Sequence, residues 1–215
     1  HRGDKMTIDT KDMLNSILES ISRISYIKPE EIPEIDLYMD QVTTFMESHL
    51  SSSRRHEGDK ILTKTMINNY AKNNLLPPPV KKKYSKEHLL MLTFIYYLKN
   101  ILCINDIQTL LDPISQNYFS GDGSMDMTEL YNEIMNLELK QIEPLAKDVT
   151  KKYKLACSSF EHATEEEQDF LRKFSFICML SFDVYVKKQV IEKIIDDMAD
   201  NQPKETKNKN KNSKK

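Results

Sequence analysis

Hydrophobic residues recur every three or four positions along most of the chain, a spacing that predicts amphipathic α-helices. The first such pattern covers residues 10–27 and should end before the linker from Pro29 to Pro33. A second runs over residues 39–50 and is followed by the polar loop SSSRRHEGD. His49 lies on its apolar stripe, where a histidine without neighbouring metal ligands is expected to be packed and hydrogen-bonded.

The stretch TKTMINNYAK predicts a third, short helix with two different faces. Thr63 is its expected N-cap, and its apolar side is formed by Met66, Ile67, Tyr70 and Ala71. The opposite side carries Thr65, Asn68, Asn69 and Lys72, without an acidic residue. Because Asn can bond adenine bidentately and Lys and Thr can hold phosphates or base edges, this face favours base reading. An ordinary solvated helix face is the alternative.

The sequence LLPPPVKKKY follows that helix. Leu75 and Leu76 are expected to anchor in a core, and the prolines then force a stiff, extended exit. This exit holds residues 81–83, all lysines, beside the polar helix. Ser85 is the expected cap of a fourth helix, which is apolar around much of its circumference and includes Leu89, Leu92, Phe94, Ile95, Leu98, Ile101 and Leu102.

Two further helix starts carry capping signals. A short helix is predicted from Asn105, with Gln108 as a capping-box variant, and should end at Asp112-Pro113. Thr164 and Glu167 form a capping box before an apolar series that reaches Ala199. An unbroken helix of that length would be about 50 Å long, longer than a small domain can cover. We therefore expect a symmetric homodimer held by the C-terminal helices.

Composition supports an all-α fold, since only four of 215 residues are glycine and helix-forming residues are abundant. The three cysteines lie far apart, which suggests neither a disulfide framework nor a zinc site and points to a reducing, cytoplasmic setting. The most apolar run, LLMLTFIYYL, is about half the length of a membrane-spanning helix. No phosphate-binding loop, dinucleotide fingerprint or nucleophile elbow occurs, so neither an enzyme nor a cofactor is expected.

Charge is distributed unevenly behind a net value of −2. Residues 60–86 hold seven lysines and no acid, residues 201–215 carry a net +5, and the remainder carries −14. A compact basic segment in an acidic protein implies a localised anionic partner such as double-stranded DNA. The low-complexity segment 201–215 is expected to be a disordered tail.

The motif DGSMDMTELYNE resembles a calcium-binding loop at several ligand positions. Its sixth position, where such a loop needs glycine for its sharp turn, is Met127. Capping of the next helix by Asp126 or Ser124 accounts for the same residues. We therefore expect a helix cap and not a metal site.

The blocks LYMDQVTTFMESHL, LTKTMINNYAKNNLLPPPVKKKYSKEHLL and LKNILCINDIQTLL resemble domain-of-unknown-function family 1836, a bacterial family, over roughly residues 30–130. The middle block is also similar to the DNA-binding head of mercury-resistance-type (MerR-like) regulators. In that head a recognition helix leads into a Leu-Leu-Pro turn, a wing and a Tyr-Ser-capped helix. The shared pattern falls on Ile67, Asn68, Tyr70, Leu75, Leu76, Pro77, Tyr84, Ser85, Leu92, Leu98, Ile107 and Leu111.

The resemblance implies a winged helix-turn-helix head. It makes Ile67 and Tyr70 core residues, puts Asn68 where such regulators usually present an arginine to DNA, and makes residues 82–84 the stub of the wing. Two departures stand out. The Gly-Tyr-Arg hairpin of the wing is missing, and the loop over residues 51–62 is longer than usual.

The sequence thus predicts a DNA-binding transcriptional regulator, with an α-helical protein-interaction module as the alternative. The expected DNA-binding residues are Lys64, Thr65, Asn68, Asn69, Lys72, Lys81, Lys82, Lys83 and Tyr84. The expected division is an N-terminal helix (1–30), a MerR-like head (31–113), a C-terminal dimerisation and sensing region (114–200) and the tail (201–215). The resemblance further implies that the sensing region could take a small-molecule effector.

Overall fold

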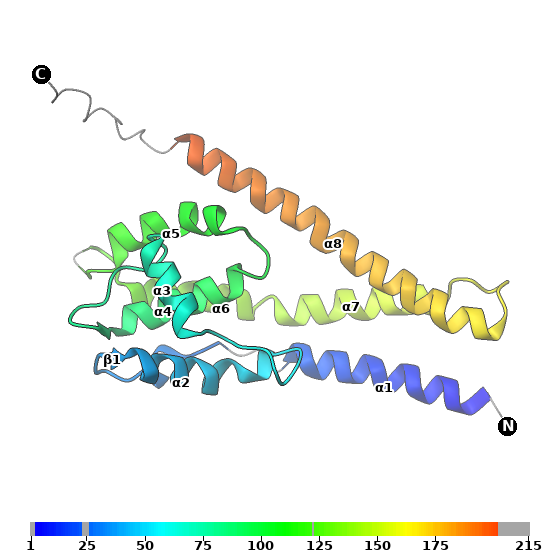
Figure 1. Cartoon of the computed structure of the whole chain (residues 1–215). Helices are drawn as coiled ribbons and strands as arrows, with labels where there is room; N and C mark the ends of the chain where they lie inside the picture. The colour runs from blue at the N-terminus through cyan, green and yellow to red at the C-terminus, as the bar shows by residue number, and fades with distance from the viewer. Residues whose placement is uncertain (1–2, 23–25, 122, 202–215) are drawn as a thin grey trace, which may run out of the picture.

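The computed structural model describes residues 3–22, 26–121 and 123–201, with side chains from residue 12 to 21 in the first range. Most of these residues are helical, which confirms the all-α class. One small antiparallel sheet pairs β1 (Leu37–Tyr38) with β2 (Lys83–Tyr84). The helices, labelled in Figure 1, are α1 (Gly3–Ser22), α2 (Met39–Leu50), α3 (Lys64–Lys72), α4 (Lys86–Leu98), α5 (Ile104–Tyr118), α6 (Met127–Leu139), α7 (Ile142–Cys157) and α8 (Glu165–Asn201).

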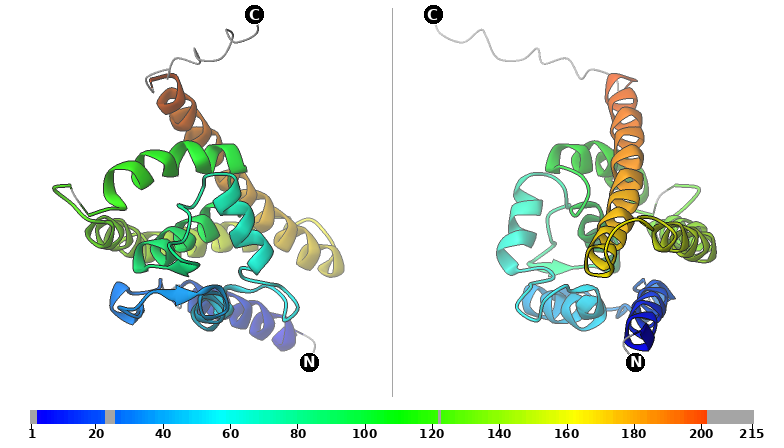
Figure 2. Two further views of the ribbon diagram at one scale, coloured as in Figure 1. Left: turned by 60° about the vertical axis from the view of Figure 1, so that its left-hand side comes forward. Right: turned by 90° about the vertical axis from the view of Figure 1, so that its right-hand side faces the viewer.

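The described chain forms a compact head and a long arm. The head contains α2 to α6 and both strands, whereas α1, α7 and much of α8 extend away from it (Figure 1). The views in Figure 2 show α8 running obliquely past the head, with its C-terminal end near α5. α1 packs on α7, α7 packs on α8, and α5 contacts α8. Within the described residues, no helix combines the length and hydrophobicity needed to cross a membrane.

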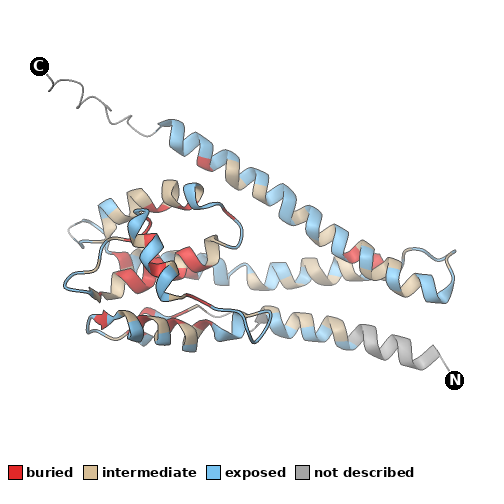
Figure 3. Cartoon of the chain, viewed as in Figure 1, coloured by how far each residue is buried: buried red, intermediate tan, exposed pale blue. Residues whose placement is uncertain are grey.

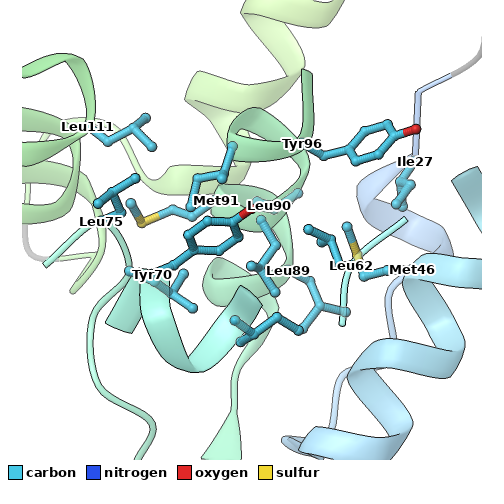
Figure 4. Close-up of a cluster of buried hydrophobic side chains, with 14 of the residues drawn as sticks. Ile27, Met46, Leu62, Tyr70, Leu75, Leu89, Leu90, Met91, Tyr96 and Leu111 are labelled. Atoms are coloured by element: carbon cyan, nitrogen blue, oxygen red, sulfur yellow. The ribbon is translucent and has the colours of Figure 1, made fainter. Parts of the chain in front are cut away.

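α4 is the centre of the head. Its residues 88–93 are all buried, as its nearly continuous apolar sequence predicted, and neighbouring helices cover it on several sides (Figures 3 and 4). α6 belongs to the same core, because Tyr131 is fully buried and its hydroxyl donates to the carbonyl of Ile27 (2.8 Å). The core therefore joins the segment before β1 to a helix about a hundred residues further along the chain.

Predicted helix caps are present at three starts. The Met66 N–H donates to Thr63 Oγ1 (3.2 Å) at α3. At α6 the Glu129 N–H donates to Asp126 Oδ1 (2.8 Å), and the Asp126 N–H donates back to Glu129 Oε2 (3.0 Å). The Thr164 N–H likewise donates to Glu167 Oε2 (3.1 Å) at α8. Asp126 is thus a capping residue, while Asp122 of the calcium-loop pattern lies outside the described residues.

Two predicted helix ends are wrong. α1 ends at Ser22, and Ile27 is a non-helical residue buried in the head. α5 continues through Pro113 to Tyr118. The proline removes one backbone hydrogen bond, but the apolar face continues across it, because Leu111 and Ile114 both pack on the core. The predicted boundary at residue 113 therefore falls inside a helix.

The α7–α8 hairpin is held by a few well-defined contacts. The rings of Tyr153 and Phe176 meet edge to face with centroids 5.5 Å apart. Lys152 Nζ lies 2.7 Å from Asp183 Oδ2, which joins the two helices near their middle. α8 is unbroken over 37 residues, as predicted, and is therefore roughly 55 Å long.

Candidate nucleic-acid interface

α3 presents the polar face that its sequence predicted. Ile67 and Tyr70 are buried, so the helix is rotated as expected. The residues on its outer side are all exposed and comprise Lys64, Thr65, Asn68, Asn69 and Lys72. Lys64 forms an ion pair with Asp40 of α2, which partly neutralises the first of these cations. The remaining four residues are turned outwards on a helix that lies on the near side of the head in Figure 1.

The end of α3 fixes the direction of the chain that follows. Asn74 has a left-handed backbone (φ 58°), and its N–H donates to the Ala71 carbonyl (3.3 Å). The Leu75 N–H donates to the Tyr70 carbonyl (2.9 Å), which completes a Schellman motif with Asn in place of the usual Gly. Leu75 and Leu76 are buried, as predicted, and lead the chain into the proline segment.

The lysine run forms a β-hairpin of minimal length, which we call the lysine hairpin (residues 80–83). Val80 and Lys83 exchange two backbone hydrogen bonds, of 3.1 and 2.9 Å. Lys81 and Lys82 occupy its tip with φ values of 49° and 66°. Positive φ at both central residues is the signature of a type I′ turn. This short hairpin pairs with β1 through Lys83 and Tyr84.

Lysine is an unusual residue for this tip. Type I′ turns favour Asn-Gly, because the left-handed backbone conformation costs about 1–2 kcal/mol for residues other than Gly, Asn and Asp. Lys81 and Lys82 are both exposed, so no burial of their side chains offsets that cost. Strain retained at an exposed position is a reason to look for a functional use of the side chain. Two ammonium groups on a rigid tip are suited to binding phosphates.

The remaining two predicted residues are placed differently. Lys83 is half-buried, with its Nζ 5.2 Å from the centroid of the Tyr38 ring, a cation–π contact that ties the hairpin to β1. Tyr84 is 3% exposed and its ring packs against His88. Its side chain therefore belongs to the core and cannot form part of an exposed DNA-binding surface.

His88 connects the base of the hairpin to α4 and was not singled out from the sequence. It is 3% exposed, and its ring meets Tyr84 and Phe119 edge to face. The Ser85 N–H donates to Nδ1 (3.0 Å), so His88 completes the cap of α4 in its neutral form with the proton on Nε2. Nε2 is directed at the carbonyls of Pro77 and Pro78 but meets neither in good hydrogen-bonding geometry.

Burial lowers the pKa of His88 below its usual value. The proline carbonyls and the negative charges of Glu87 and Asp36 act in the opposite direction but do not reverse the shift. His49, by contrast, is half-buried, stacks on Phe45 (4.0 Å) and bonds the Phe45 carbonyl through Nδ1 (2.9 Å). It is a packed and satisfied residue, as predicted.

Metal sites and clefts that could hold a ligand are the other kinds of site to consider in the described part of the chain. His, Cys, Asp and Glu side chains do not come together there in a group of three or more that could hold a metal ion. A cleft of about 320 Å³ lies between residues 26–30 and α6, lined by Tyr26, Tyr131, Met135 and Leu139 among others. The Tyr26 hydroxyl donates to Glu138 across one side of it.

A protein-family model described as Domain of unknown function (DUF1836) matches residues 27–134. The match begins with the buried Ile27 and ends in α6, so it covers the head and stops before the arm. Comparison with the curated proteins and with the solved structures gave no significant match.

Proposed function

The chain belongs to the family described as Domain of unknown function (DUF1836), and we propose that it binds duplex DNA as a transcriptional regulator. The binding surface consists of the outer face of α3 and the tip of the lysine hairpin. α3 reads base edges, and Lys81 and Lys82 hold phosphates on the neighbouring backbone. The observation that carries this proposal is the pair of strained, exposed lysines that follows, nine residues after α3, an exposed helix face without acidic residues.

The dimensions and chemistry of α3 support the proposal. An α-helix with its side chains is about 10–12 Å across and therefore fits a major groove about 12 Å wide, and the nine residues of α3 give it a length of about 13 Å. Asn68 and Asn69 are exposed amides of the kind that bond adenine at N6 and N7. Lys72, one turn further on, carries an exposed ammonium group of the kind that binds phosphate. Buried Leu75 and Leu76 hold the end of this helix against the core, which gives the surface a rigid support.

Selection of bound sequences from a pool of random duplexes tests the proposal. Enrichment of a defined motif, with affinity that falls steeply as salt increases, is the expected result. A pool that stays unenriched at low salt would exclude sequence-specific binding. That result would favour the alternative of an α-helical protein-interaction module.

Replacing Asn68 or Asn69 with Ala should weaken binding to the selected sequence by about 1–3 kcal/mol for each asparagine–adenine pair that the substitution removes. Binding to unrelated duplexes should change little, because the interactions with the DNA backbone remain. Both amides are exposed, so the melting temperature should stay nearly constant. Fluorescence anisotropy with specific and scrambled duplexes measures the difference.

Asn136→Ala is the matched control for these variants, since Asn136 is also an exposed helical asparagine but lies on α6. It should bind both duplexes like the unmodified protein. An equal loss of affinity in all three variants, or no loss in any of them, would show that Asn68 and Asn69 do not contact the bases.

A further inference from the structure

α8 carries a regular apolar stripe that the described part of the chain covers at only one end. Phe170, Phe174, Ile177, Ser181 and Val184 follow one another at intervals of four and three residues, with Tyr185 beside them. We call these six residues the α8 seam. Alternating intervals of three and four residues are the pattern of a helix that packs along its length against another helix.

The same spacing continues into a part of α8 that is already packed. Ile191 and Ile195 lie further along the repeat, and both belong to the hydrophobic core near α5. The seam itself is open, since its five larger residues are all exposed, and Figure 3 shows most of α8 in the exposed colour. The contacts with α7 do not cover it, because they use other residues of α8 such as Phe176 and Asp183.

From this surface we infer that two copies of the chain pair through their α8 seams in antiparallel orientation. The twofold axis passes between Ile177 and Cys178, the midpoint of the seam. Phe170 then faces Tyr185 of the second copy, and Phe174 faces the small Ser181, so that a large side chain meets a small one. This inference does not depend on DNA binding.

Charge at the two ends of the seam selects the antiparallel orientation. Residues 165–167 are three exposed glutamates at the start of α8, whereas Lys187 and Lys188 follow the seam. In the antiparallel pair the glutamates of one copy lie beside the lysines of the other. A parallel pair would place glutamates against glutamates and lysines against lysines, which is unfavourable.

The area of the seam suits a second copy. Its aromatic residues are each more than half exposed, and each can bury on the order of 100 Å². With Ile177 and Val184 the seam offers roughly 500 Å² per copy, most of the roughly 600 Å² per partner found in the smaller specific interfaces. An apolar patch of about 300–600 Å² is the largest that a typical monomeric protein exposes, and such a patch is often functional.

Sedimentation equilibrium of the full chain is the first test, with a dimer expected at twice the monomer mass of 25.2 kDa. Ile177→Asp should convert the dimer to a monomer. Val190→Asp is the matched control, because Val190 is a similarly exposed aliphatic residue of α8 (54% against 59%) that lies off the seam. Thermal melts by circular dichroism should show that both variants remain folded, since neither side chain is buried.

Cross-linking determines the orientation. In a background where Cys103, Cys157 and Cys178 are replaced by Ser, Glu166→Cys and Gln189→Cys chains are mixed and treated with a short bismaleimide. The antiparallel register predicts cross-links between the two variants and few within either one. Cross-links only between identical variants would overturn the orientation. A monomer at micromolar concentration would overturn the pairing itself, as would equal dissociation by both aspartate variants.

Discussion

Replacing Lys81 with Asn and Lys82 with Gly is expected to stabilise the fold and, at the same time, to weaken binding to every duplex. Asn-Gly is the preferred pair for a type I′ turn, so the strain at the hairpin tip should be relieved. The gain should be about 1–2 kcal/mol in total, equivalent to a melting temperature higher by roughly 2–8 °C. Removing two phosphate-binding charges should flatten the dependence of log affinity on log salt by about 2.

Two control variants separate these effects. Lys81→Ala/Lys82→Ala removes the same charges but leaves side chains in the left-handed region, so DNA binding should fall without the gain in stability. Lys151→Ala/Lys154→Ala removes two exposed charges from α7, away from the head, and should change neither property much. Thermal denaturation and anisotropy titrations at several salt concentrations measure both. If Asn-Gly binds DNA like the original pair, the two lysines are not phosphate ligands.

The sequence predicts the elements of the interface well because their signals are local. The Thr63 side chain caps α3 by accepting from the N–H of Met66, three residues further along the chain. The burial of Ile67 and the exposure of the adjacent Asn68 follow from helical periodicity alone. The burial of Leu75 and Leu76 is also predictable from the local sequence, because an apolar pair directly before prolines is expected to pack in the core. These features require no knowledge of distant parts of the chain.

Features that depend on distant contacts were not predictable in the same way. α5 passes through Pro113 because packing on the core outweighs the missing hydrogen bond, and that packing is not visible in the local sequence. Tyr131 joins the head because its hydroxyl finds the Ile27 carbonyl. The lysine hairpin was missed because its tip lacks the glycine and asparagine that normally identify a type I′ turn.

His88 illustrates how a functional surface depends on a buried residue behind it. One ring touches the end of β2 through Tyr84, closes the cap of α4 through Ser85 and faces the carbonyls of the proline segment. Anything that moves this ring loosens the hairpin and the exit from α3 together. Protonation is one such change, because Nδ1 can accept the Ser85 N–H only while it carries no proton.

The stability of the protein should therefore fall as the pH drops below about 6.5, the ordinary pKa of histidine. The folded protein holds the pKa of His88 below that value, so in the interval between the two values the unfolded chain binds more protons. Acidification consequently favours unfolding, by at most about 1.4 kcal/mol per pH unit from this residue. Urea denaturation between pH 7.5 and roughly 5 measures the free energy of unfolding.

His88→Gln is the informative comparison, because glutamine at this position can still accept the Ser85 N–H as in an ordinary capping box but does not titrate. The stability of His88→Gln should depend less on pH than that of the unmodified protein. His88→Ala should lose the cap and the ring packing together, about 2–4 kcal/mol at neutral pH. Parallel pH profiles for the unmodified protein and His88→Gln would show that His88 does not control this transition.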